Sequence, residues 1–548
     1  MANRGHPVQV VRLDKKSNGL ELNIDALAEI CLNEKCRERP LCVVSIAGDF
    51  RKGKSFMLNF FLRYLYHVSD KQQALKANQE QGEDDKQEQN DEATKSKQSQ
   101  PYYSESFDED WLGNPDEELG GFSWRGGSKP ETTGILVWDD PIVVTCPNGQ
   151  EVAVLLMDTQ GAFDSRQTIG QTAIIFALST LTSSLQIYNV MNNIQEDNLQ
   201  ILDTFLAYGQ LVLDKSSEKP FQELCFLVRD WRSPMDHSYG SEGGASLLKE
   251  KLELQDEDPE SADNKTRRRI ESCFEKKACF LMPYPGERVS VEEGGPFRGQ
   301  ISAMKQNFVD HLRVFVPQVL SPKNLLVKRI GGEPVNGQSL LEYFRVYAET
   351  FKGEKIPEAK NLYDATAEAS NLAAVANSKN FYLKSMKNIC GAHKPYVNPK
   401  ILEQKHNQLL KDSLKMFENT KKLGEEDYSK NYSDNLMKEL VSSFDEFVEM
   451  NNSKNMFNMW GSPLILLCFW FLAFTLSRIF ELIGIGFLAN LFYLQATICF
   501  ISIIAYLSLK YTGNFPDAVV AVDRVAEFCW VKAMDTAVGQ ITQRMQHT

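Results

Sequence analysis

The stretch Gly48-Asp49-Phe50-Arg51-Lys52-Gly53-Lys54-Ser55 decides the fold of this 548-residue chain. An apolar, strand-like run from Leu41 to Ala47 precedes it, and a helix-like run from Phe56 to Leu65 follows it. In such a strand-loop-helix setting, backbone N–H groups converge on the β- and γ-phosphates of a nucleotide at a helix N-terminus. Lys54 supplies a positive charge, and the Ser55 hydroxyl completes the shell of a Mg²⁺ ion. We therefore expect the chain to bind a nucleoside triphosphate; a glycine turn without a ligand is the alternative.

Length and charge limit the class of protein. A chain of 548 residues is too long for one core, so we expect two or more domains. The net charge of −13 offers no basic field, and we expect no nucleic-acid partner. Residues 1–12 lack the apolar core of a signal peptide, and the eleven cysteines form no Cys-x-x-Cys pattern. Both features favour a cytosolic nucleotide domain with reduced thiols.

A second apolar run predicts a strand that carries a metal-binding carboxylate. Residues 151–157 are mostly apolar and end in Asp158-Thr159-Gln160-Gly161. A buried parallel strand here would deliver Asp158 to its C-terminal edge. We expect Asp158 to hold Mg²⁺ through water and the Gly161 N–H to sense the γ-phosphate. A strand-end turn without a ligand is the alternative for Asp158.

A glycine-rich stretch, residues 120–127, precedes Thr132-Thr133 and would let a loop close over the nucleotide. One of these threonines is expected to ligate Mg²⁺ when triphosphate is bound, which would make the loop a switch. The pattern leaves open whether Thr132 or Thr133 does so, and a capping hydroxyl is the alternative.

The identity of the base depends on the strand-like run 224–228, which ends in Arg229-Asp230. The Asp230 carboxylate can accept two hydrogen bonds from the N1–H and N2 amine of guanine, a pattern that adenine does not offer. The sequence thus favours GTP over ATP. The alternative is a surface ion pair at a strand end.

Four strings of this sequence resemble those of the atlastins, dynamin-superfamily GTPases that fuse endoplasmic reticulum (ER) membranes. They are the loop 48–55, Gly121–Ser128, Asp158–Asp164 and Leu227–Trp231. The resemblance extends from Val8 onward, whereas guanylate-binding proteins share the plan of the GTPase domain but not the end of the chain. It implies a GTPase that dimerises with itself in trans and in cis and maintains the tubular ER network and its three-way junctions. It also implies a multi-pass ER membrane protein with cytosolic termini, and other ER-shaping hairpin proteins are candidate partners.

The same resemblance implies roles for individual residues. Arg51 would be an arginine finger acting in cis, which suits the chemistry because Ala162 stands where Ras-like enzymes carry a water-orienting glutamine. A plain phosphate-contacting arginine is the alternative. Arg51, Lys54 and Thr132 are thus the expected catalytic residues. Further nucleotide contacts implied by the family are Lys52, Gly53, Phe56, Gln160, Arg229 and Val289, while Glu292 departs from the asparagine common in the guanine cap.

Residues 70–101 interrupt the expected GTPase domain, which we assign to residues 1–325. This stretch is rich in Gln, Lys, Glu and Asp and nearly free of apolar residues. It cannot bury enough surface to fold, so we expect a disordered insert.

The pattern after the GTPase domain becomes helical. Residues 326–338 read as a linker, followed by apolar residues at three- and four-residue spacing over 339–351, 357–390 and 399–451. We expect an all-α three-helix bundle over 339–451. The resemblance implies that it swings about the linker.

Residues 461–511 contain two almost wholly apolar runs, 463–485 and 486–509. At about 20 residues per crossing, they predict a transmembrane hairpin that returns the chain to the cytosol. Hydropathy leaves open whether the hairpin spans the bilayer or enters one leaflet. Within residues 515–548, an amphipathic helix beginning at Pro516 would lie in the lipid interface or, alternatively, cover the bundle.

The expected fold is therefore an α/β P-loop GTPase domain, a three-helix bundle, a transmembrane helical hairpin and a C-terminal amphipathic helix. With GTP/GDP and Mg²⁺ as ligands and the lipid bilayer as a partner, we expect a GTPase that fuses ER membranes by GTP-dependent dimerisation. Alternatives are a GTP-regulated tether and a hairpin wedge that shapes membranes without fusing them.

Overall fold

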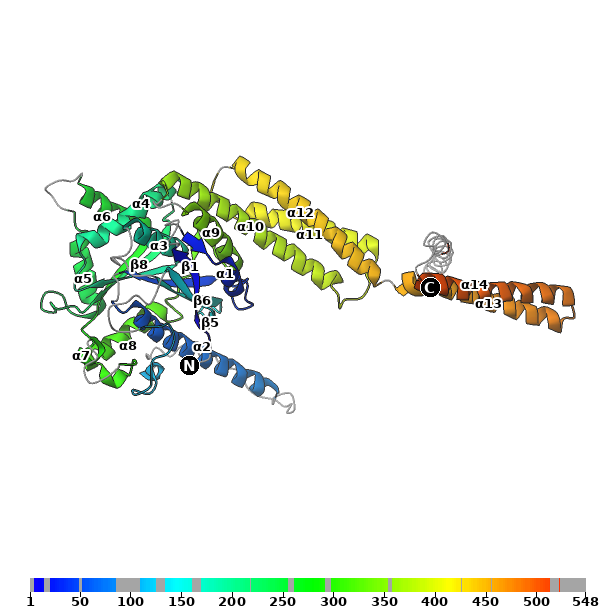
Figure 1. The fold of residues 1–548 in the computed structure, drawn as a ribbon, viewed down its shortest axis with the longest axis horizontal. Helices are drawn as coiled ribbons and strands as arrows, with labels where there is room; N and C mark the ends of the chain where they lie inside the picture. The colour runs from blue at the N-terminus through cyan, green and yellow to red at the C-terminus, as the bar shows by residue number, and fades with distance from the viewer. Residues whose placement is uncertain are drawn as a thin grey trace, which may run out of the picture. The chain divides into compact units, whose positions relative to one another are not determined.

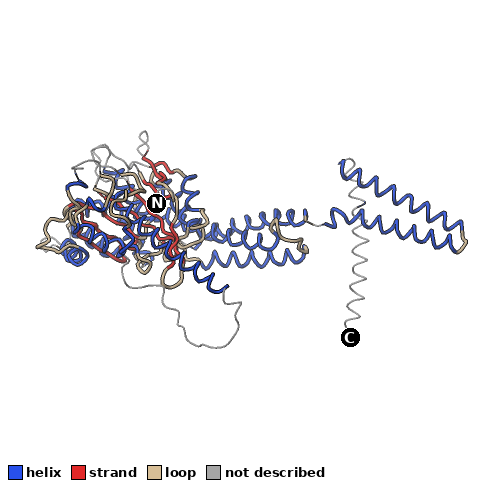
Figure 2. Tube along the Cα trace, turned by 90° about the horizontal axis from the view of Figure 1, so that it is seen from below, coloured by secondary structure: helices blue, strands red, loops and turns tan. Residues whose placement is uncertain are grey.

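The computed structural model consists of two compact units (Figures 1 and 2). Unit 1 comprises residues 1–378 and 415–435, and unit 2 comprises residues 379–414 and 436–548. The residues that the structure describes are 4–13, 20–48, 52–84, 109–124, 134–159, 169–216, 218–254, 261–290, 297–352, 357–424, 426–454, 456–512 and 522.

Unit 1 is built on a nine-stranded sheet in the order β2-β1-β4-β6-β3-β7-β8-β9, with β5 paired to β6. The strands of this sheet are β1 (Pro7–Leu13), β2 (Leu20–Leu22), β3 (Leu41–Gly48), β4 (Ile135–Trp138), β5 (Ile142–Thr145), β6 (Glu151–Thr159), β7 (Leu185–Met191), β8 (Phe221–Arg229) and β9 (Phe274–Leu281). The helices of the same region are α1 (Ile24–Cys31), α2 (Lys54–Asp84), α3 (Ile169–Thr182), α4 (Glu196–Ser216), α5 (Gly240–Leu252), α6 (Ala262–Cys273), α7 (Glu287–Ser290), α8 (Gln306–Leu320) and α9 (Gly337–Thr350).

The central strands β6, β3, β7, β8 and β9 pair in parallel, and helices cover both faces of the sheet (Figure 1). Every residue of β3 and of β8 is buried. Apolar runs of this kind suit strands that are covered on both sides. One buried cluster joins the sheet to α1, α3, α4 and α9, and the other joins it to α2 and α8. The predicted α/β architecture is confirmed.

Helix α2 continues well beyond the point where the sequence predicted disorder to begin. We expected an insert without structure from Asp70, but the helix extends to Asp84. Gln72 anchors this extension, because its side chain donates to the Thr145 carbonyl at 2.9 Å and accepts from the Thr145 N–H at 2.8 Å. Gln, Ala, Lys and Glu are also good helix formers. The prediction was wrong for residues 70–84, and residues 85–101 lie outside the described part of the chain.

The expected linker, residues 326–338, is a short hairpin of β10 (Arg329–Ile330) and β11 (Glu333–Pro334). Gly331 and Gly332 both have positive φ, the conformation that a tight hairpin turn requires. The Lys328 N–H donates to the Leu41 carbonyl at 2.7 Å, at the start of β3. The linker is therefore joined to the GTPase sheet by backbone hydrogen bonds.

Helix α9 corresponds to the first helix predicted for the bundle, and it packs on the GTPase domain as well as on the helix that follows it. Its buried side chains, such as Leu340, Phe344 and Tyr347, belong to the same core cluster as the sheet. The sequence predicted this amphipathic helix correctly. We expected the helix to pack within the bundle, and the structure shows that it also covers the GTPase domain.

The remaining soluble helices are α10 (Ala359–Cys390), α11 (Pro399–Asn419) and α12 (Glu426–Ser453). The sequence predicted one helix over 399–451, and the structure breaks it in two. Gly424 has φ +101°, and the Leu423 N–H donates to the Ser370 hydroxyl at 3.2 Å. A positive φ is incompatible with an α-helix, which explains the break.

Unit 2 contains the apolar helices α13 (Met456–Leu482) and α14 (Gly486–Thr512), which pack side by side (Figure 2). Residues 462–482 and 486–509 each have a mean hydropathy of 1.9 and are long enough to cross a membrane. In the most apolar 18-residue window of each segment, 17% is buried, whereas the core helix of a soluble fold is mostly buried. The Ser477 hydroxyl donates to the Ala489 carbonyl at 2.9 Å and joins the two helices. The predicted hairpin is present; the amphipathic tail lies outside the described residues apart from Val522.

Candidate nucleotide site

The candidate site lies where the carboxyl ends of the parallel strands meet. Strand β3 ends at Gly48, and α2 begins at Lys54. The sheet register places Ile46 beside Asp158 of β6, and Gly48 beside Asn189 of β7. In open α/β sheets, ligands bind outside this edge. The loop predicted to hold phosphate therefore stands next to the ends of both neighbouring strands.

Lys54 and Ser55 begin α2 next to the end of β6. Lys54 is 6% exposed, and its Nζ donates to the Gly48 carbonyl at 3.2 Å. The Ser55 hydroxyl donates to Oδ2 of the fully buried Asp158 at 2.5 Å. Hydroxyl and carboxylate oxygens are the ligands that Mg²⁺ prefers. The two residues predicted to share a magnesium ion thus lie in contact, and their chemistry fits that ion.

The Arg229 side chain contacts the backbone of the phosphate-binding loop. Its Nη1 donates to the carbonyls of Lys52 and Gly53 at 3.4 and 3.5 Å, and its guanidinium lies 5.6 Å from the Phe308 ring centroid. Burial lowers the pKa of Arg229, and the neighbouring Asp230 carboxylate partly offsets this effect. The side chain was predicted to contact the nucleotide, and the contacts that the structure shows are to the loop backbone.

Asp230 follows β8 directly, at the position predicted to read guanine. Its φ is +56°, an uncommon conformation for a residue other than glycine. Burial raises the pKa of its carboxyl group, while the positive charges of Arg229, Arg232 and Lys52 oppose that rise. Sparsely populated backbone conformations of this kind collect at ligand sites.

Sequence reasoning missed Asn189. This residue is fully buried near the end of β7, and its Nδ2 donates to the Lys52 carbonyl at 3.1 Å. The available signal was a single amide inside the apolar run 187–190. Its significance appears only when β7 is known to lie beside β3.

Phe56 and Val289 were predicted to contact the nucleotide as well. The Phe56 ring is 4% exposed and packs against Phe60 and Trp124, with centroid distances of 5.1 and 5.0 Å. It is therefore part of an aromatic cluster. Val289 lies in α7, where its N–H donates to the Gly286 carbonyl at 3.2 Å. The other predicted site residues, which lie outside the described part of the chain, are Arg51, Thr132, Thr133, Gln160, Gly161 and Glu292.

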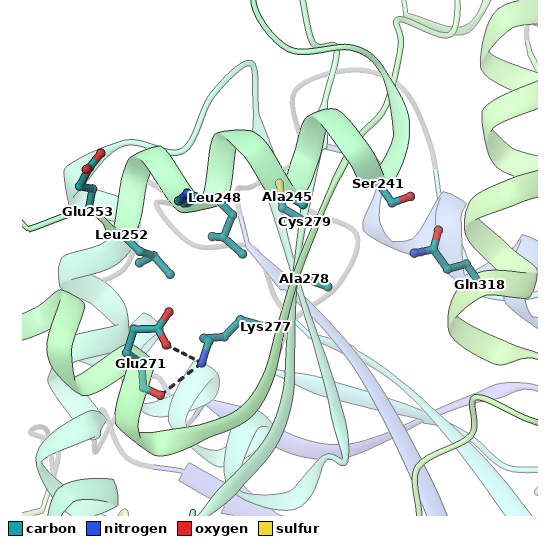
Figure 3. A pocket seen from close by; sticks show the side chains of 11 residues that line it. Ser241, Ala245, Leu248, Leu252, Glu253, Glu271, Lys277, Ala278, Cys279 and Gln318 are labelled. Carbon is teal, nitrogen blue, oxygen red and sulfur yellow. Dashed lines mark hydrogen bonds and ion pairs between the residues drawn. The ribbon is translucent and has the colours of Figure 1, made fainter.

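A separate hollow of about 560 Å³ lies beside β9 (Figure 3). Its lining comes from α5, α6, β9 and α8, and the ion pair of Lys277 with Glu271, at 2.8 Å, stands at one side. None of these elements contributes to the loop between β3 and α2. The hollow is thus not the predicted phosphate site.

Comparison with known proteins agrees with this arrangement. A family model described as guanylate-binding protein, N-terminal domain, matches residues 17–329. Human Atlastin-3 is 40% identical over 537 residues, which cover 98% of this chain and 92% of the relative. Human Atlastin-2 is 40% identical over 96% of this chain and 84% of its own length. Atlastin-1 of Bos taurus is 38% identical over 96% of this chain and 86% of its own length.

Proposed function

This chain belongs to the atlastin family and carries a GTPase domain of the guanylate-binding-protein type, and from this premise we propose how it works. It hydrolyses GTP to GDP and phosphate. We propose that it is anchored in the ER membrane by its apolar hairpin, with both termini in the cytosol. There it tethers and fuses ER membranes through GTP-dependent dimerisation with a second copy.

The contacts at the end of β3 support the assignment of roles to the loop residues. Lys54 would bind the β- and γ-phosphates as a point charge, because its amine is held at the N-terminus of α2. Ser55, Asp158 and either Thr132 or Thr133 would hold Mg²⁺, which when bound neutralises charge on the phosphate oxygens. Arg51 would stabilise the charge of the transition state in cis.

The proposed preference for guanine depends on Asp230. Its carboxylate stands at the strand end where a nucleotide base is expected, and it can accept both guanine donors when ionised. The cations Arg229, Arg232 and Lys52 favour that ionised form. Val289 would cover the base from α7.

One observation carries the link from nucleotide to membrane: a single chain joins a phosphate-binding loop to two exposed apolar helices. Differential contacts with triphosphate and diphosphate can shift a population between two states of the GTPase domain. We propose that the triphosphate state pairs with a second copy on an opposing bilayer, in trans, and that cis pairs form within one membrane. Other ER-shaping hairpin proteins are further proposed partners.

The test is lipid mixing between proteoliposomes that carry the full-length protein. GTP should drive mixing, and Lys54→Ala or Arg51→Ala should abolish it. Lys352→Ala, at an exposed lysine paired with Glu349, is the matched control and should mix lipids normally. Mixing that persists in the loop variants would contradict the proposed fusion activity and favour a hairpin wedge.

A further inference from the structure

Asn189 occupies an unusual position for a side-chain amide. It is fully buried in β7, where the register places it beside Gly48 of β3 and Leu227 of β8. Burying an amide costs free energy unless hydrogen bonds replace those made with water. A residue at this place needs a reason beyond packing, since Ile187, two positions earlier on the same face of the strand, is fully buried with an apolar side chain.

The amide is directed at the backbone of the phosphate-binding loop. Its Nδ2 donates to the Lys52 carbonyl at 3.1 Å, and Nη1 of Arg229 reaches the same oxygen at 3.4 Å. Two donors from two neighbouring strands therefore hold one loop carbonyl. The Oδ1 atom of Asn189 is buried and has no hydrogen-bond partner within the described part of the chain.

Fixing this carbonyl also fixes the N–H on the other side of the same peptide. No cis peptide bond occurs among the described residues, so the Lys52–Gly53 peptide is trans and planar. Its C=O and N–H then point in opposite directions. With the Lys52 carbonyl turned toward β7 and β8, the Gly53 N–H is turned away from these strands. The first N–H groups of a helix lack partners within the helix, and Gly53 directly precedes α2.

The backbone of Asn189 fixes the start of the same loop. Gly48 has φ +134°, and a Cβ atom added there would lie 2.0 Å from the Asn189 carbonyl oxygen. The backbones of β3 and β7 are thus in direct contact at this point, and Gly48 has no room to move toward β7. Asn189 meets the loop at both of its described ends, through its backbone at Gly48 and through its side chain at Lys52.

We propose that Asn189 is a positioning residue for phosphate binding. By holding the Lys52 carbonyl, it presents the Gly53 N–H as a donor to a nucleoside diphosphate or triphosphate. Because it acts on a group shared by substrate and product, it governs affinity for both nucleotides and leaves the chemical step at saturation unchanged. This inference rests on nucleotide binding at the loop, as proposed above.

The experiment compares full-length Asn189→Ala and Asn189→Leu with the wild type by fluorescence titration with labelled GDP and a labelled non-hydrolysable GTP analogue. Both variants lack the N–H donor, so both dissociation constants should rise by about tenfold to a hundredfold, with kcat at saturating GTP kept within about twofold. Gln186→Ala is the matched control. This amide is also buried in β7, but it bonds to Ser179 and Ser183 at the opposite end of the strand. Its loss should lower the melting temperature without changing either dissociation constant.

Three results would overturn the positioning role. The first is unchanged affinity in Asn189→Leu, which would show that the donor is not needed. The second is a loss of kcat at constant affinity, and the third is failure of both Asn189 variants to fold while Gln186→Ala folds. Absence of nucleotide binding by the wild type would instead contradict the proposed function.

Discussion

Replacement of Lys328 by methionine should change the stability of unit 1 in a strongly pH-dependent way. Lys328 is fully buried at the linker hairpin, and its Nζ donates to the Ser183 carbonyl at 2.8 Å. Burial lowers the pKa of this lysine from 10.5 to about 7, and the nearby Glu275 only partly opposes that effect. Between about pH 7 and pH 10.5, the folded protein therefore holds a largely neutral amine where the unfolded chain holds an ammonium ion.

The magnitude follows from proton linkage. A lowering of the pKa from 10.5 to about 7 corresponds to a cost of at most about 5 kcal/mol, at about 1.4 kcal/mol for each pH unit. Because the unfolded chain binds the extra proton, this cost is absent above pH 10.5, grows as the pH falls toward 7 and is constant below 7. Methionine removes the cost but leaves the Ser183 carbonyl without its donor, at about 1–3 kcal/mol at every pH. The variant should thus be more stable than the wild type at pH 7 and less stable near pH 10.

The assay is thermal unfolding of the full-length protein in detergent, followed by tryptophan fluorescence at pH values from 6 to 10. A difference of 1 kcal/mol should move the midpoint by about 2 °C for a unit of this size. Lys352→Met, at a lysine that is 61% exposed, is the control and should show a constant difference from the wild type. A difference for Lys328→Met that stays constant between pH 7 and pH 10 would refute the reasoning, since it would mean that burial does not perturb this amine.

Three further predictions concern single positions. Lys54→Met should weaken binding of a fluorescent GTP analogue by on the order of a hundredfold, because it removes the amine at the N-terminus of α2; binding within threefold of the wild type would contradict its role. Gly48→Ala should destabilise unit 1 by more than about 3 kcal/mol in thermal unfolding, since its Cβ would lie 2.0 Å from the Asn189 carbonyl oxygen; an unchanged midpoint would show that the strands can separate there. His406 is buried in unit 2, with Nδ1 at 2.7 Å from the Tyr382 hydroxyl, and burial lowers its pKa even though Glu403 and Asp445 oppose this. Wild-type unit 2 should therefore lose stability as the pH falls below about 6.5, and His406→Phe should lessen that loss in circular-dichroism melts at pH 7.5 and 5.5; equal pH dependence would count against a buried neutral imidazole.

The parts of the site that sequence could predict are those encoded locally. The loop 48–55 stands between an apolar strand and a helix, and Asp158 ends a second apolar strand, so their approach follows from the geometry of parallel strands. We predicted on that basis that Ser55 and Asp158 serve the same magnesium ion, and the structure shows their side chains in contact. The contact of Asn189 with the loop and the direction of the Arg229 side chain were not predicted. Both depend on which strands are neighbours in the sheet.

Helix packing shows the same limit. The apolar stripe of α9 predicts a helix but does not say which surface it covers, and the structure shows that it belongs to the GTPase core. The composition of residues 70–84 is equally typical of a solvated helix and of disorder. The hydrogen bonds between Gln72 and Thr145 stabilise the helical form. They join residues far apart in the chain, so the local sequence does not reveal them. By contrast, the hairpin was predictable because hydropathy alone determines it.

The most direct measurement of the central claim is content mixing between two populations of proteoliposomes that both carry the full-length protein. The coupling of GTP turnover at the β3–α2 loop to the apolar hairpin predicts mixing of the contents with GTP and none with GDP or a non-hydrolysable analogue. Equal mixing in all three conditions would contradict that coupling. Docking with GTP without any content mixing would show a tether in place of a fusion protein.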